Sequence, residues 1–208
     1  MKLWSNSFQD GSKIPEEFAF GKYHPETHIQ LSGNRNPHLA WSDLPQDTRS
    51  LVLIVCDPDV PSKPDNVNQE GKTVPVSLPR TDFYHWVLVD LAPNVSAIEA
   101  GQFSDRVTPR GKQDSISALK TRQGINSYRE WFAEDAEMSG DYYGYDGLCP
   151  PWNDEIVHRY HFTLYAIDLE RCPVEGKFTA PDVLKAIETN ILEQVTLTGT
   201  YSINPEAQ

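Results

Sequence analysis

Several apolar stretches stand out along the chain, and most of them predict strands. Residues 51–56 are apolar throughout and end at the turn-forming sequence DPDVPS, while residues 83–91 and 157–167 are dense in aromatic and β-branched side chains. Residues 195–203 show strand-like alternation. Residues 179–194 carry apolar side chains at helical spacing, and Pro181 suits a first turn, so we predict the main helix there.

The connections between these stretches are long and rich in proline, glycine and asparagine. Residues 1–50 break repeatedly at such residues, residues 62–82 form an unusually long connection, and residues 94–144 are mostly irregular apart from a short predicted helix at 127–136. The predicted strands do not alternate regularly with helices along the chain, and this order of elements indicates antiparallel sheets. We therefore predict a single, mainly β domain over residues 1–208.

Composition narrows the class of protein further. The longest apolar run, residues 51–56, is far below the roughly 18 residues that span a bilayer, and the first residues lack the apolar core of a secretory signal. The formal charge of −12 argues against nucleic acid as a partner. The 3 cysteines form no C-x-x-C pair, which predicts a reducing compartment without a disulfide framework. These features predict a cytoplasmic protein without a membrane span.

Ionisable side chains gather where the predicted strands begin or end. Asp57 and Asp59 follow the first strand, His85 lies within the second, and His158 and Arg159 open the third. If these strands are neighbours in one sheet, the groups converge at one edge of it. Each also has a plainer interpretation, because aspartates brace turns, histidines pack in cores and arginines pair with carboxylates.

Five motifs in this order carry a family resemblance. They are NPHLAW at 36–41, DPDVP at 57–61, YHWVLVDLAP at 84–93, CPPWNDEIVHRYHFTLYAID at 149–168 and TGTYSINP at 198–205. Together they resemble the phosphatidylethanolamine-binding protein family, in its bacterial Raf-kinase-inhibitor-like branch. The resemblance implies a large central antiparallel sheet, a smaller sheet packed on it and a helix near the C-terminus.

The same resemblance implies a small pocket for an anion such as phosphate or a phosphoethanolamine-like head group. It also implies no cofactor, a kinase or protease as a protein partner, and a homodimer, since bacterial relatives are often dimers. Carried over by motif, the ligand-binding residues are Asp57, Asp59, His85, Gly147, Pro150, Pro151, His158 and Tyr160.

The chain departs from the family pattern in three places. Leu148 stands where a proline is usual, the connection 62–82 is longer than in short members, and residues 190–192 read Asn-Ile-Leu where histidine-valine-leucine is common. The extra length of this connection could cover the mouth of the pocket.

Two aspartates suit an anion site only when the protonation of the site is taken into account. A nearby carboxylate favours the imidazolium and raises the histidine pKa above about 6.5, which would turn His85 and His158 into cationic donors. Alternatively, one aspartate is protonated and donates directly. Anion binding is then expected to weaken as the pH rises through the histidine titration.

Two enzyme alternatives use the same residues. The two imidazoles and two carboxylates form a donor set that suits zinc, although no local metal-binding motif is present. A small-molecule hydrolase could use Cys149 as nucleophile and His158 as base. The simpler interpretation of Cys149 is a small apolar residue lining a loop.

Overall fold

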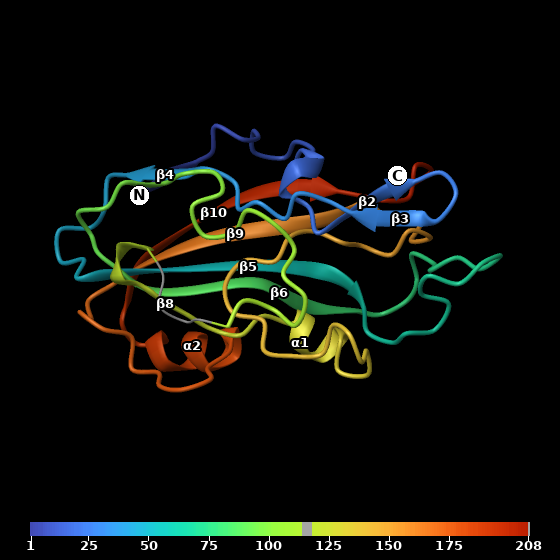
Figure 1. Ribbon diagram of the computed structural model, residues 1–208. Helices are drawn as coiled ribbons and strands as arrows, with labels where there is room; N and C mark the ends of the chain where they lie inside the picture. The colour runs from blue at the N-terminus through green and yellow to red at the C-terminus, as the bar shows by residue number, and fades with distance from the viewer. Residues whose placement is uncertain (114–117, 208) are drawn as a thin grey trace.

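A five-stranded antiparallel sheet forms the centre of the molecule, in the order β10-β9-β5-β6-β8 (Figure 1). The structure, a computed structural model, describes residues 1–113 and 118–207. The sheet consists of β5 (Ser50–Pro61), β6 (Arg80–Leu91), β8 (Arg122–Gln123), β9 (His158–Ile167) and β10 (Ile191–Tyr201). The predicted mainly β fold with a large antiparallel sheet is confirmed.

The remaining elements cover the two faces of this sheet. The small sheet of β1 (Lys2–Trp4), β4 (Leu39–Ser42) and β7 (Ala97–Ile98) lies over one face, and α1 (Tyr128–Trp131) and α2 (Ala180–Ile187) lie over the other (Figure 1). The hairpin of β2 (Gly21–His24) and β3 (His28–Leu31) and the short 3-10 turns Glu16–Phe18 and Ala118–Lys120 complete the described elements.

Strand β5 is apolar on both faces because both faces are covered. Leu53 and Val55 belong to the core shared with the small sheet, whereas Val52 and Ile54 pack in the core beneath α2. Side chains alternate between the two faces of a strand, so covering only one face would have required polar residues at every second position. The uninterrupted apolar run at 51–56 follows from this double burial.

Strand β5 does not stop at residue 56 as the sequence predicted. It continues to Pro61, and its pairing with β6 shifts register between Asp57 and Val60. Such irregularities in a ladder accommodate proline, which has no N–H to donate, and they redirect side chains. Here the irregular segment contains both aspartates of the DPDVP motif.

The first half of the helix predicted over residues 179–194 is present as α2, but the second half of the prediction is wrong because α2 ends at Ile187. Asn190 turns the chain, with its side chain bonded to Asp168, and Ile191 then pairs with Ile167 at the start of β10. Pairing with β9 therefore overrides the helical spacing of the last apolar residues. The predicted helix at 127–136 is also shorter, and none of the helices in the described part of the chain is long and apolar enough to cross a bilayer.

The outer edge of β10 is covered near its end by the N-terminal segment. The backbone N–H groups of Gly11 and Ile14 donate to the carbonyls of Thr198 and Thr200, at 2.7 and 2.8 Å. The N–H of Thr200 donates in return to the carbonyl of Ser12 at 2.9 Å. The edge backbone is thus paired at this end of the sheet.

The start of α2 generates a first prediction. One carboxylate oxygen of Asp182 accepts both the backbone N–H of Thr179, at 2.9 Å, and its hydroxyl, at 2.8 Å. We expect Asp182→Ala to lower the free energy of unfolding by about 0.5–1 kcal/mol in urea denaturation, because these helix-end groups lose their partner. Glu188→Ala, beyond the other end of the helix, is the control. An equally large loss in the control would contradict this role.

Candidate functional site

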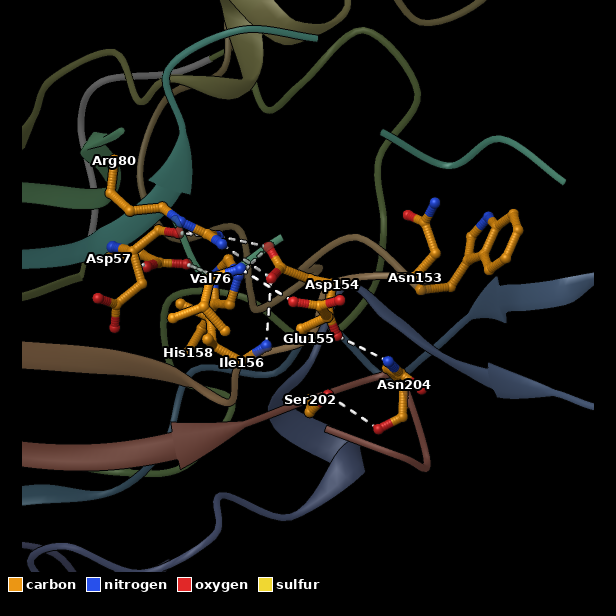
Figure 2. A network of polar contacts seen from close by, with 12 residues as sticks. Asp57, Val76, Arg80, Asn153, Asp154, Glu155, Ile156, His158, Ser202 and Asn204 are labelled. Atoms are coloured by element: carbon orange, nitrogen blue, oxygen red, sulfur yellow. Dashed lines mark hydrogen bonds and ion pairs between the residues drawn. The ribbon is translucent and has the colours of Figure 1, made fainter. Parts of the chain in front are cut away.

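A line of four ionic side chains, of which three are buried and Arg80 is partly exposed, joins three strands and a loop (Figure 2). His158, at the start of β9, has its Nδ1 2.7 Å from Asp57 Oδ2 on β5 and its Nε2 3.1 Å from Asp154 Oδ2 in the preceding loop. Arg80, the first residue of β6, donates two hydrogen bonds to Asp154, at 2.5 and 3.1 Å. His158, Asp57 and Asp154 are almost completely buried.

The two carboxylates make His158 a permanent cation at neutral pH. Burial alone would lower its pKa, but the hydrogen bonds to Asp154 and Asp57 outweigh this and raise the pKa to about 9. For the carboxyl of Asp154, burial by itself would raise the pKa. The hydrogen bonds from His158 and Arg80 outweigh burial, so the pKa of Asp154 is lowered. With two anions and two cations in line, the network is neutral as a whole.

The second aspartate of the DPDVP motif is directed elsewhere. Asp59 accepts hydrogen bonds from the backbone N–H, Nε and one terminal nitrogen of Arg159, at 2.9, 2.9 and 2.7 Å. Burial opposes ionisation of Asp59, but these bonds prevail and lower its pKa. Asp59 therefore ties β5 to β9 across the irregular segment, and it does not line the cavity described next.

A cavity of about 760 Å³ opens beside Asp57, within the range of about 300–1,000 Å³ that small-molecule sites occupy. Of the predicted ligand-binding residues, those that line it are Asp57, His85, Pro150 and Pro151. Asp57 and His85 are 1% and 3% exposed, so they form the floor, whereas Trp131 on α1 is 49% exposed and lies towards solvent. The cavity also reaches the start of α2 at Thr179, Ala180 and Pro181.

His85 holds an uncommitted polar atom at this floor. Its Nδ1 lies 2.9 Å from the carbonyl of Asp146 and must donate, which leaves Nε2 without a proton in the neutral ring. That Nε2 is buried and has no hydrogen-bond partner among the described residues. Buried polar atoms in this condition are rare in native proteins, and they often mark a place where a ligand or water binds.

The two histidines of the site differ in charge. Burial lowers the pKa of His85, and the nearby Asp57 and the hydrogen bond to Asp146 only partly offset this. His85 is therefore neutral at pH 7. The sequence-based expectation of a raised histidine pKa is correct for His158 and wrong for His85, because only His158 forms hydrogen bonds to carboxylates.

Tyr160 lies between the two histidines without facing the cavity. Its ring centroid is 5.4 Å from that of His85 and 6.5 Å from that of His158. The hydroxyl is buried and forms no hydrogen bond of normal geometry within the described residues. Burial first, and then the charge of Asp57, raises its pKa well above the ordinary value, so it remains a neutral phenol.

Gly147 does not line the cavity, but it allows its own loop to approach the backbone of residues 18–20 closely. A side-chain carbon at this position would lie 2.2 Å from the carbonyl oxygen of Phe18, which no larger residue could tolerate. Its N–H donates to Asn34 at 2.7 Å, and its carbonyl accepts the hydroxyl of Tyr128 at 2.6 Å. Gly147 thereby fixes the loop that leads to Pro150.

Next to Gly147, Asp146 is a second buried anion that the sequence did not single out. Asn34 and Asn126 donate to its two carboxylate oxygens, at 2.8 and 2.9 Å, and Lys112 is 3.0 Å away. Its backbone carbonyl accepts from His85. This cluster therefore sets the orientation of the imidazole at the cavity floor.

The hydrolase alternative meets two obstacles. Burial raises the pKa of the Cys149 thiol to about 12, so it is protonated and a poor nucleophile at neutral pH. Both ring nitrogens of His158 are already engaged with carboxylates. For the metal alternative, residues 1–113 and 118–207 contain no group of three or more His, Cys, Asp or Glu side chains arranged to hold an ion.

The structure thus brings together most of the predicted residues, in two layers. Asp57, His85 and the two prolines face the cavity, while His158, Tyr160, Gly147 and Asp59 lie behind or beside them. Sequence reasoning missed Asp154, Arg80, Asp146 and Lys112. Asp154 precedes His158 by four positions, but nothing in this spacing distinguishes it from a surface acid in a loop.

Fold and site together define a mainly β protein with a ligand-sized cavity beside a buried ionic network, and comparison with known proteins agrees. The family model described as phosphatidylethanolamine-binding protein matches residues 4–202. The chain is 29% identical to the UPF0098 protein YbhB of Escherichia coli K12, over 97% of this chain and 100% of the relative. It is 31% identical to a UPF0098 protein of Chlamydia muridarum, over 97% and 98%.

Solved structures show the same fold. A phosphatidylethanolamine-binding protein homolog from Chlamydia trachomatis, CT736, superposes with a TM-score of 0.63 at 28% identity, over 96% of this chain and 95% of that one. Escherichia coli YbcL superposes with a TM-score of 0.68 at 23% identity, over 97% of both chains. The chain belongs to the phosphatidylethanolamine-binding protein family.

The ionic network generates the second prediction. His158→Gln removes the cation between two buried carboxylates and is expected to cost about 3–5 kcal/mol of unfolding free energy. In the wild type, a histidine pKa raised from 6.5 to about 9 contributes stability that is complete below pH 6.5 and is lost as the pH rises to about 9. We expect this loss, of up to roughly 3 kcal/mol, to be absent from the variant.

Urea denaturation at pH 6, 7.5 and 9 measures both effects. His161→Gln is the matched control, because this histidine of β9 bonds to Thr198 and lies outside the network. Equal pH dependence in the wild type and His158→Gln would contradict the charge assigned to His158.

Proposed function

We propose that the cavity binds a small phosphorylated ligand, with His85 Nε2 as the contact to a phosphate oxygen. The observation that carries this proposal is the buried, unpartnered Nε2 at the floor of the cavity. Membership of a family described as phosphatidylethanolamine-binding supports the same ligand chemistry.

The neutral state of His85 dictates how an anion would bind. The bare Nε2 accepts a hydrogen bond, so the ligand brings the proton, either kept on a phosphate oxygen or transferred to the ring. The groups around the imidazole are Asp57, Asp146, Tyr128 and Tyr160; the first two favour a proton on it, and neither phenol carries a charge at neutral pH. Asp57 does not repel the ligand with a full charge, because His158 neutralises it from behind.

This mechanism predicts that binding consumes a proton at neutral pH and above. Phosphate monoesters have a second pKa of about 6, and the pKa of His85 is lowered, so neither partner carries the shared proton at high pH. We expect affinity for phosphoethanolamine to fall by up to about tenfold per pH unit from pH 7 to 8.5. Isothermal titration calorimetry measures it, and equal affinity at pH 5.5 and 8.5 would contradict the shared proton.

A substitution isolates the role of Nε2. The amide nitrogen of asparagine can take the place of Nδ1, so His85→Asn keeps a donor for the Asp146 carbonyl and removes Nε2. We expect it to weaken phosphoethanolamine binding at least about tenfold, the cost of one hydrogen bond to a charged group. His24→Gln, on the hairpin away from the cavity, is the control. Unchanged affinity in His85→Asn, with the fold intact by circular dichroism, would refute the proposed contact.

An enzyme remains the alternative, and the same histidine favours it, since a neutral imidazole with a free Nε2 can act as a general base. Release of inorganic phosphate from phosphoethanolamine during these titrations would favour catalysis over binding. Cytoplasmic location, a homodimer and a kinase or protease partner stay predictions from the sequence.

A further inference from the structure

The long connection between β5 and β6 packs against the loop that precedes β9. We call residues 62–74 of it the strap. Asn153, which is 5% exposed, holds the strap by its side chain: its amide donates to the carbonyls of Asn66 and Lys72, at 2.8 and 3.0 Å, and its oxygen accepts the N–H of Asn68, at 3.0 Å.

Backbone contacts continue this attachment. The N–H of Val74 donates to the carbonyl of Asn153 at 3.0 Å, and that of Glu155 donates to the carbonyl of Val74 at 3.1 Å. The side-chain oxygen of Asn68 also accepts the N–H of Trp152 at 3.0 Å. The strap is therefore fixed at several points. A single side chain, Asn153, supplies four of its bonds, the fourth being a longer one of 3.4 Å from its amide to the carbonyl of Gln69.

The strap forms one wall of the cavity. Its lining residues are Ser62, Lys63, Pro64 and Val67, and the cavity is also lined by Trp131 of α1, by Phe132 directly after it and by Pro181 of α2. The two sides together enclose an outer compartment above the polar floor at Asp57 and His85. Its apolar surface comes from Pro64, Val67, Trp131, Phe132 and Pro181, and the charged side chains of Lys63, Asp82 and Glu130 also line the cavity. Trp131 is half exposed there, so its ring is available to a ligand.

The cavity is larger than a phosphate group needs. Its volume of about 760 Å³ suits a drug-sized molecule, and the contact proposed for phosphate uses only the floor. A ligand that fills the remainder has to cover apolar surface. Hydrophobic burial then adds to the affinity in proportion to the area covered.

We propose that the outer compartment binds an apolar substituent of a phosphomonoester, and that Asn153 is the positioning residue that holds its wall in place. This inference rests on the proposed phosphate contact at His85 and adds the class of ligand. The substituent can be an alkyl chain or an aromatic ring, and both are tested as separate ligands.

The experiment compares inorganic phosphate, hexyl phosphate and phenyl phosphate by calorimetry at pH 6.5. We expect at least one ester to bind at least about tenfold more tightly than phosphate, which corresponds to burial of about two methylene groups. A larger gain for hexyl phosphate would indicate a lipid-like alcohol, and a larger gain for phenyl phosphate would indicate stacking on Trp131.

Two variants test the wall. Asn153→Ala should speed hydrogen exchange in residues 66–74 and reduce the advantage of the ester at least about threefold, with phosphate affinity within about twofold of the wild type. Val67→Ser removes apolar lining without removing the anchor, so it should also reduce the advantage of the ester if Asn153→Ala fails to fold. Asn190→Ala, in the turn before β10, is the matched control.

The outcomes separate this inference from the function on which it rests. If neither phosphate nor an ester binds, the proposed function fails. If phosphate binds but neither ester binds more tightly, the phosphate contact stands and the apolar compartment is refuted. Equal weakening of phosphate and ester by Val67→Ser would also overturn the assignment, because a wall for the substituent should not affect phosphate.

Discussion

The site depends on one interaction, the pairing of His158 with two buried carboxylates. Burying an isolated charge is very costly, and removing one member of a buried pair leaves its partner uncompensated. Here two anions and two cations alternate from Asp57 to Arg80, and they come from β5, β9, β6 and the loop between α1 and β9. Asp57 belongs both to this network and to the floor of the cavity. The network, most of which lies outside the cavity, therefore fixes the position of one floor residue.

This arrangement gives two histidines opposite roles. His158 is surrounded by carboxylates and is a fixed structural cation, whereas His85 donates to a backbone carbonyl and stays neutral with one nitrogen unused. The rings of both histidines contact the ring of Tyr160, so only this side chain lies between the charged and the uncharged imidazole. Burial therefore does not decide the charge of a histidine by itself; the hydrogen-bond acceptor does.

Much of the fold could be predicted from the sequence, and the errors have physical causes. The apolar run at 51–56 and the dense run at 157–167 identified β5 and β9 because doubly covered strands need no polar positions. The end of α2 was misplaced because strand pairing at Ile191 competes with helical spacing. For the site, motifs identified Asp57 and His158, but Arg80 at the other end of the network reaches Asp154 across 74 positions, and no local pattern encodes such a contact.

The N-terminal segment along β10 has a consequence for the behaviour of the molecule in solution. An unpaired sheet edge is a template onto which another molecule can add a strand. Residues 10–14 occupy that template at Thr198 and Thr200, using their own backbone and the carboxylate of Asp10. Residues 10–14 thus prevent the strand of another molecule from pairing with β10 at Thr198 and Thr200.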